Sequence, residues 1–265
     1  MTTSQPREPI PGATPIRPED LVSAPREFPS HRWGFGAFLL VEAVLIASAA
    51  FVSALLGDPP AGQPLPIRTV LLGTMLPAMI AAGVALLATV VRGNGPKLDL
   101  RLEWRWADVK IGFKFGLLGL VLTSLSAWVW TEIVGSADAT SAISALVDDR
   151  KMSVSAAIVT FVYLWLLGPI CEEIIYRGLL WGAVERLQWR SERWGRMAAF
   201  LLSTAVFAAS HLEPLRTTLL LVIAVPIGLA RLATGRLPGS VVAHSMNNFL
   251  PSVAILLGSL GVSSF

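Results

Sequence analysis

Long apolar runs dominate this chain and restrict it to one class of fold. At 1.5 Å per residue, the longer runs can cross a hydrocarbon core of roughly 30 Å. Hydrophobic residues make up 54% of the sequence and charged residues only 15%, which does not fit a single soluble core. We therefore predict an all-α, polytopic membrane protein of seven or eight spans. The predicted spans are Gly34–Gly57, Ile67–Val91, Ile111–Val134, Ser153–Leu187, Met197–Ser210, Thr217–Ala230 and Leu237–Leu260.

The segment Ser153–Leu187 is too long for one ordinary span. It contains Gly168 and Pro169, and a proline inside a helix removes a backbone hydrogen bond and disfavours a straight, continuous helix. We therefore predict one helix to about Leu167, then a break, then a second helix. If both pieces cross the membrane, the chain has eight spans and the later helices reverse their direction. The side of the membrane that holds the C-terminus stays open at this point.

Basic residues mark one side of the predicted bundle. They concentrate in the loops 92–110 and 186–196 and in the tail 1–32, which alternate correctly with the spans. The positive-inside rule therefore places the N-terminus in the cytoplasm, and the composition, rich in alanine and arginine, favours a bacterial plasma membrane. The net charge of +3 comes mostly from such loops, so we predict no nucleic-acid binding.

The chain divides into three parts by composition. The tail 1–32 holds seven prolines, mixed charges and almost no apolar run, which predicts disorder. The second part, 33–152, supplies membrane helices. The third part, 153–262, also carries the unusual polar residues. The single cysteine, Cys171, excludes an intramolecular disulfide.

Three charged side chains, Glu172, Glu173 and Arg177, interrupt the apolar part of the chain. A charge at the bilayer centre costs about 2.5–3.5 kcal/mol on insertion scales. Glu173 and Arg177 are four residues apart, so on a helix they share a face and can pair. Glu172 points about 100° away and lacks that partner. An unpaired carboxylate at membrane depth predicts a functional site.

Two histidines lie in other apolar segments. His211 follows Phe207 by four residues and His244 precedes Asn248 by four, so each pair shares a helix face. Three separate helices thus contribute polar groups, which have little reason to be there unless they meet. Together they offer a carboxylate base, imidazoles and an amide donor, which suits water activation and oxyanion stabilisation. Glu172, His211 and His244 also match a catalytic zinc site with three protein ligands.

Each of these residues also has a simpler explanation. Glu173 and Arg177 can form a purely structural ion pair. His211 can be a hydrogen-bonded packing residue, and Asn248, beside Asn247, can simply join two helices. The residues alone leave these explanations open beside hydrolysis.

The three segments resemble the CPBP family of CAAX-protease and bacteriocin-processing intramembrane proteases, also called the ABI family. Its pattern is Glu-Glu-x-x-x-Arg, then Phe-x-x-x-His, then His-x-x-x-Asn. The resemblance covers about residues 153–250, and the N-terminal half contributes only membrane helices of a general kind. The matching residues are Glu172, Glu173, Arg177, Phe207, His211, His244 and Asn248.

The resemblance implies intramembrane hydrolysis of a peptide bond, at a site buried among the C-terminal helices. Glu172 would activate the attacking water with assistance from His211. His244 and Asn248 would hold the oxyanion or complete a metal site.

The same resemblance implies that Glu173 and Arg177 orient these groups. Members of the family are described both as metal-dependent and as glutamate proteases. Zinc or another divalent metal therefore stays open as a cofactor, and we expect no other. The expected partners are the lipid bilayer and a membrane-associated peptide or protein, of the prenylated CAAX type or of the bacteriocin type.

Two other functions stay open. A non-catalytic bacteriocin-immunity or membrane scaffold protein would keep the motifs for binding. A small transporter would use Glu172, or Glu42 in the first span, as an ion or proton relay. The simpler explanation of Glu42 is a carboxylate that faces the bundle and has a hydrogen-bond partner.

The predicted spans place the candidate residues at unequal depths in the membrane. His211 lies about fourteen residues from its basic loop, whereas His244 lies about seven residues beyond Leu237. A working site requires them to be level. We therefore expect breaks at the prolines 169, 214 and 251 to reshape these helices around a wet cavity.

Overall fold

The computed structural model describes residues 32–57, 65–135 and 151–262, so the predicted disordered tail lies almost entirely outside the described part of the chain. All regular structure in these residues is helical, which confirms the all-α fold class. The long helices are α1 (Phe35–Leu56), α2 (Ile67–Arg92), α4 (Trp106–Val134), α10 (Glu192–Ser210), α11 (Thr217–Thr234) and α12 (Leu237–Ser259). A short helix, α3 (Pro96–Asp99), follows α2, and a 3-10 turn, η4 (Pro214–Arg216), precedes α11.

Six helical segments of the described residues are long and apolar enough to cross a membrane, close to the predicted number. The apolar part of α10 was predicted as a further span, but α10 is not among the six. Its first turns carry Glu192, Arg193 and Arg196, which lower its hydropathy. The six segments are Phe35–Leu56, Ile67–Arg92, Trp106–Val134, Val154–Glu185, Pro214–Thr234 and Leu237–Ser259.

The predicted break at Pro169 is wrong, because helical structure runs without interruption from Val154 to Glu185. Two π turns take the place of the break. The backbone N–H of Gly168 bonds to the carbonyl of Tyr163, five residues back instead of four, and this wider register accommodates the proline. One continuous segment also removes the eight-span alternative. Its parts are α7 (Val154–Val162), η2 (Tyr163–Leu167), α8 (Gly168–Glu173), η3 (Ile174–Leu180) and α9 (Trp181–Glu185).

Of the other two expected breaks, the structure has the one at Pro214 and lacks the one at Pro251. Pro251 lies inside α12, which continues to Ser259, so this proline does not end the helix. Pro214 opens the turn η4, which separates α10 from α11, so the expected break at this proline is present.

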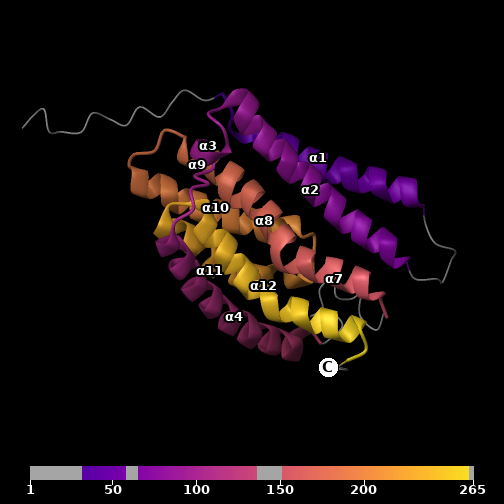
Figure 1. The fold of residues 1–265 in the computed structure, drawn as a ribbon. Helices are drawn as coiled ribbons and strands as arrows, with labels where there is room; N and C mark the ends of the chain where they lie inside the picture. The colour runs from indigo at the N-terminus through magenta and orange to yellow at the C-terminus, as the bar shows by residue number, and fades with distance from the viewer. Residues whose placement is uncertain (1–31, 58–64, 136–150, 263–265) are drawn as a thin grey trace, which may run out of the picture. The chain divides into compact units, whose positions relative to one another are not determined.

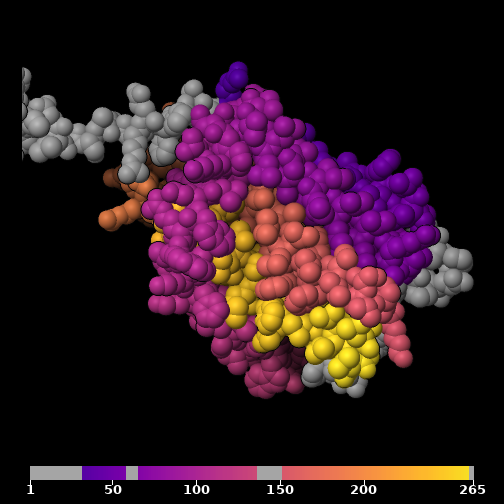
Figure 2. Space-filling model, in the orientation of Figure 1, coloured from indigo at the N-terminus to yellow at the C-terminus, as the bar shows by residue number. Residues whose placement is uncertain are grey.

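Helix α12 lies between α4 and the segment Val154–Glu185, and α1 and α2 pack against the other side of that segment (Figure 1). The space-filling view shows the same order on one face, where the segment 154–185 lies between α2 and α12 (Figure 2). Helix α10 packs against η3, and α11 contacts η3 through hydrogen bonds to Arg177. The segment with the two glutamates therefore has neighbours on several sides.

Glycines let α4 approach α12 closely. Gly112, Gly116 and Gly119 lie on one face of α4 and are buried. A Cβ atom at Gly112 would lie 2.4 Å from the carbonyl oxygen of Gly239, and one at Gly116 would lie 2.5 Å from the Cβ of Met246. Close backbone packing of this kind stabilises helix pairs in membranes, where the hydrophobic effect between helices is absent.

Gly112→Ala is expected to destabilise the bundle by about 1–3 kcal/mol, since the new methyl group meets a backbone oxygen that cannot rotate away. The matched control is Gly83→Ala on α2, where a Cβ has no neighbour within 4 Å. That change should be neutral or slightly stabilising, because alanine favours a helix more than glycine does. Thermal unfolding in detergent micelles compares the two variants, and equal midpoints would contradict this account of the α4–α12 contact.

Polar interactions lock the helices together at the end of the bundle that carries the basic loops, here called the basic end (92–105, 186–196 and 231–236). The indole of Trp33 donates to Asp99 at 2.7 Å, and Arg186 lies 3.6 Å from the same carboxylate and 3.9 Å from the centre of the Trp33 ring. Burial lowers the pKa of Arg186, and the charge of Asp99 partly offsets this effect. These contacts fix the start of α1 against the end of α9.

A second pair at the basic end fixes the turn between α11 and α12. The guanidinium of Arg236 donates to both oxygens of Asp108 on α4, at 2.6 and 2.9 Å. The hydrogen bond to Asp108 raises the pKa of Arg236. With the turn held, α12 starts at a defined height beside α4, which sets the level at which His244 enters the bundle.

Candidate active site

The three polar motifs meet around the ring of Phe207 on α10. This ring contacts the imidazole of His211 at 4.8 Å and that of His244 at 5.6 Å, measured between ring centroids. The guanidinium carbon of Arg177 lies 4.3 Å from the same centroid, and the Tyr176 ring lies 5.5 Å away. The two histidines are therefore level, although the residue counts along their helices differ.

Glu173 is the hub of the buried polar groups. Its Oε1 accepts hydrogen bonds from Arg177 Nη1 at 3.1 Å and from His244 Nδ1 at 3.0 Å. The side chains of Glu173 and Arg177 are 0% exposed, and that of His244 is 4% exposed. The predicted pairing of Glu173 with Arg177 is thus confirmed. A carboxylate buried this deeply needs such partners, because an unpaired charge in the interior costs several kcal/mol.

The geometry fixes which nitrogen of His244 carries the proton. A carboxylate oxygen can only accept, so Nδ1 donates to Glu173 and the neutral ring keeps a free lone pair on Nε2. This Nε2 lies 3.7 Å from Oε2 of Glu172, too far for a direct hydrogen bond. Both atoms can accept a hydrogen from one water molecule. The Glu172 side chain is 31% exposed, so water can reach it.

His211 ends α10 and is exposed. Its Nδ1 lies 2.8 Å from the carbonyl oxygen of Phe207, and because a carbonyl can only accept, Nδ1 donates and Nε2 is left as an acceptor. The chain turns immediately afterwards at Leu212, which has a positive φ of 54°. His211 therefore offers the lone pair of Nε2 at the edge of the site, next to the Phe207 ring, which His244 also contacts.

The side chain of Asn248 bonds to the backbone of the segment Val154–Glu185. Its side-chain amide donates to the carbonyl oxygen of Leu164 at 3.3 Å, in the π turn η2. The neighbouring Asn247 accepts a hydrogen bond from Thr123 of α4 at 2.9 Å. Both hydrogen bonds join α12 to another helical segment, which is the simpler explanation considered for this pair of asparagines.

The candidate zinc ligands do not form a ready metal site. In the described part of the chain, no three side chains among His, Cys, Asp and Glu are grouped so that they could hold a metal ion. Nδ1 of His244 bonds to Glu173 and Nδ1 of His211 to a backbone carbonyl, so Nε2 is the nitrogen that each ring could offer to a metal. A divalent metal bound by Glu172, His211 and His244 therefore stays a prediction.

Two further residues contact the site and were not predicted from the sequence. Arg231, fully buried on α11, donates from Nε to the carbonyl oxygen of Arg177 at 3.0 Å. Its guanidinium lies 5.3 Å from the Trp181 ring centroid. Tyr176 packs on Phe207, and its hydroxyl faces the Glu42 carboxylate of α1. The sequence could have indicated Arg231, because an arginine within an apolar helix needs a buried partner. It gave no such indication for Tyr176.

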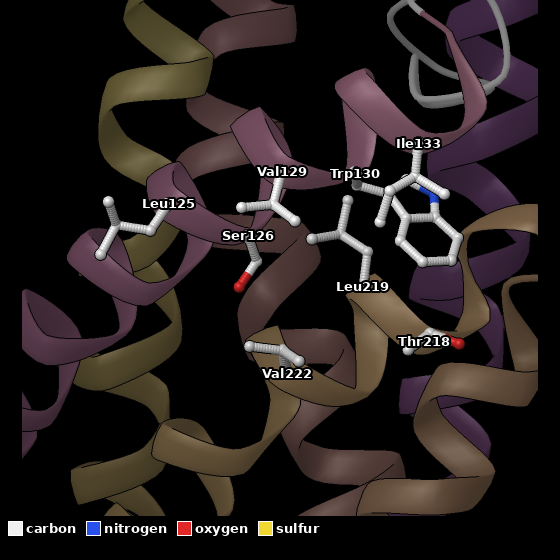
Figure 3. A pocket seen from close by; sticks show the side chains of 8 residues that line it. All are labelled: Leu125, Ser126, Val129, Trp130, Ile133, Thr218, Leu219 and Val222. Atoms are coloured by element: carbon white, nitrogen blue, oxygen red, sulfur yellow. The ribbon is translucent and has the colours of Figure 1, made fainter.

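A pocket of about 340 Å³ lies on another part of the bundle, between α4 and α11 (Figure 3). Its walls are almost entirely apolar, and the candidate site residues are not among those that line it. Figure 3 shows side chains of the two helices facing each other across it. The lining residues are Leu125, Ser126, Val129, Trp130, Ile133, Thr218, Leu219 and Val222.

Comparison with known families identifies the segment that carries the three motifs. Residues 154–250 match a family model described as type II CAAX prenyl endopeptidase Rce1-like. The match covers all three motifs and confirms the resemblance to the CPBP family over this segment. No curated protein and no solved structure matches the chain.

Proposed function

From the CPBP-type segment 154–250, we propose that this chain is an intramembrane endopeptidase that hydrolyses a peptide bond of a membrane-associated substrate. The substrate class that the family description favours is a protein or peptide with a prenylated CAAX-type C-terminus. One observation carries the proposal. Nε2 of His244 lies 3.7 Å from Oε2 of Glu172, and the rings of His244 and His211 both contact the ring of Phe207.

In this proposal Glu172 is the general base. A water molecule that donates to the Glu172 carboxylate loses a proton to it, while its oxygen forms a bond to the scissile carbonyl carbon. The carbonyl π electrons move onto the carbonyl oxygen, which becomes the oxyanion. Collapse of this intermediate breaks the C–N bond, and the leaving nitrogen takes up the proton that Glu172 had accepted from the water. His211 offers the free lone pair of Nε2 to help orient the water.

His244 is suited to carry a proton in this reaction. The Glu173 carboxylate on Nδ1 holds the ring in one orientation and stabilises its protonated form, as a carboxylate does behind a catalytic histidine. His244 accepts on Nε2 the proton that Glu172 took from the water, and then donates it either to the oxyanion or to the leaving nitrogen. Arg177 keeps Glu173 ionised and in place. The buried hydrogen bonds therefore define the orientation of His244.

The experiment that tests the proposal uses purified protein in lipid vesicles and an internally quenched, farnesylated CAAX peptide. An unprenylated peptide of the same sequence is the matched substrate control, and each reaction runs with added Zn²⁺ and with a chelator. We expect the prenylated peptide to be cleaved by the wild type and to remain intact with His211→Ala. Chelator sensitivity decides whether a metal takes part.

The same vesicles separate the two rival functions. A scaffold or immunity protein predicts no cleavage of any peptide, together with a cellular phenotype that survives Glu172→Gln and His211→Ala. A transporter predicts ion or proton flux that depends on Glu172 or Glu42. Flux without cleavage would replace the endopeptidase proposal with the transporter.

We also propose that the basic end of the bundle faces the cytoplasm of a bacterial cell, as the distribution of arginine and lysine favours. Cysteine substitutions at the exposed Trp104 and Trp194 are expected to react with a membrane-impermeant thiol reagent only after the cells are opened. Reaction in intact cells would reverse the orientation.

A further inference from the structure

Pro169 leaves one backbone carbonyl of the π turn η2 without its helical donor. In this register the N–H of Gly168 bonds to the carbonyl of Tyr163, five residues back. The next donor in the same register would be residue 169, and its acceptor would be Leu164. Proline has no N–H, so the carbonyl of Leu164 receives no bond from that position. An unpaired carbonyl at membrane depth costs free energy, because lipid offers no replacement donor.

The side chain of Asn248 supplies the missing donor. Its Nδ2 lies 3.3 Å from the carbonyl oxygen of Leu164, across 84 positions of sequence. Asn248 thus does for Leu164 what the N–H of a non-proline residue at position 169 would do. The bond also ties α12 to η2, the turn that precedes α8, at a point on α12 about one turn of helix from His244.

The opposite side of the glutamate segment has a similar arrangement. Glu172 and Glu173 end α8, which lies between the two π turns η2 and η3. In η3, the carbonyl of Arg177 accepts a hydrogen bond from the buried Arg231 of α11 at 3.0 Å. Each π turn beside the glutamates is therefore held at one carbonyl by a side chain from a neighbouring helix. These two contacts restrict how far α8 can rotate or slide.

We propose that Asn248 is a positioning residue, which holds α8 by bonding to the carbonyl that Pro169 leaves free and thereby keeps Glu172 level with His244. Only the expected effect on kcat rests on the proposed endopeptidase function; the hydrogen bond itself does not depend on it. It differs from the role that the resemblance implies, in which Asn248 would contact the oxyanion. The two roles give different results when residue 169 is changed.

The contact itself is tested without any activity. Protein labelled with [1-¹³C]leucine and ¹⁵N-tryptophan gives carbonyl signals only from Leu-Trp pairs, of which the sequence has two, at Leu164-Trp165 and Leu180-Trp181. In micelles, Asn248→Ala should move the Leu164 carbonyl signal upfield, as expected when a hydrogen bond is lost, while Leu180 serves as the internal reference. The matched control is Asn247→Ala. The amide oxygen of Asn247 accepts a hydrogen bond from Thr123, so its loss should leave the Leu164 signal in place.

Pro169→Ala should make Asn248 dispensable, because the restored N–H can bond to the Leu164 carbonyl. In that background, Asn248→Ala should no longer shift the Leu164 signal. With the farnesylated CAAX peptide as the probe, Asn248→Ala should lower kcat by roughly 10–100-fold in the native background, a loss typical of displaced catalytic groups. KM should change little, and the loss should fall below about threefold in the Pro169→Ala background, since the two sites are coupled.

Two results would overturn the inference. One is a Leu164 signal that does not move in Asn248→Ala. The other is an equal loss of kcat in both backgrounds, which would place Asn248 in direct contact with the reacting atoms. If the wild type cleaves no peptide, the proposed function fails instead, and the carbonyl signals still decide whether Asn248 holds the π turn.

Discussion

Glu172→Gln is expected to abolish peptide cleavage while the bundle stays folded. The amide has nearly the shape of the carboxylate but cannot take a proton from water, and loss of a general base costs roughly 10²–10⁴-fold in rate. Glu172 is partly exposed and makes no direct hydrogen bond to His244, so its replacement should change the free energy of unfolding little. The measurement is kcat with the farnesylated peptide, beside the unfolding midpoint of the same preparation.

The matched control for this variant is Glu192→Gln. It makes the same chemical change at an exposed position in the first turn of α10, away from Phe207. We expect it to keep the wild-type rate. If Glu172→Gln retained more than about a tenth of the wild-type kcat, the loss would be too small for a general base, and Glu172 would not be that base.

Arg177→Met is expected to have the largest effect on stability, at about 3–5 kcal/mol, because it leaves the buried Glu173 carboxylate without its cation. It also removes the donor to the carbonyl of Ala224 and the contact with the Phe207 ring. The double variant Glu173→Gln with Arg177→Met should recover part of this loss, since no buried charge remains. Unfolding free energies in bicelles provide the comparison.

Arg105→Met is the control that removes an exposed ion pair, and it separates the loss of a pair from the loss of a buried pair. Arg105 pairs with Glu103 at 3.0 Å, but both side chains are about half exposed, so this pair contributes about 0–1 kcal/mol. A loss in Arg177→Met no greater than that in Arg105→Met would contradict the account of Glu173 as a buried hub. Simple additivity in the double variant would contradict it as well.

The features that the sequence predicted well are those that depend on local spacing. The helix period places Glu173 and Arg177 on one face, and they pair in the structure. Apolar runs likewise gave the described long helices to within a few residues at most ends, because burial of a span in lipid depends on its own composition. The meeting of the three motifs followed from the cost of isolated polar groups in a membrane.

The features that were missed depend on contacts between distant parts of the chain. The rule that proline ends a helix assumes the α register, whereas at Pro169 a π turn and the amide of Asn248 keep the helix continuous. The unequal depths expected for the histidines assumed helices that start at equal heights. Contacts such as Arg236 with Asp108 set those heights instead, and no local pattern indicates them.

Hydrolysis in ¹⁸O-labelled water tests the central claim most directly. The wild-type protein in vesicles is incubated with the farnesylated CAAX peptide, and the products are weighed by mass spectrometry. We predict two fragments from one internal cut, with a single ¹⁸O in the new carboxylate and no such fragments from Glu172→Gln. An intact peptide, or fragments formed equally by wild type and Glu172→Gln, would contradict the claim that Glu172 activates water for peptide hydrolysis in this bundle.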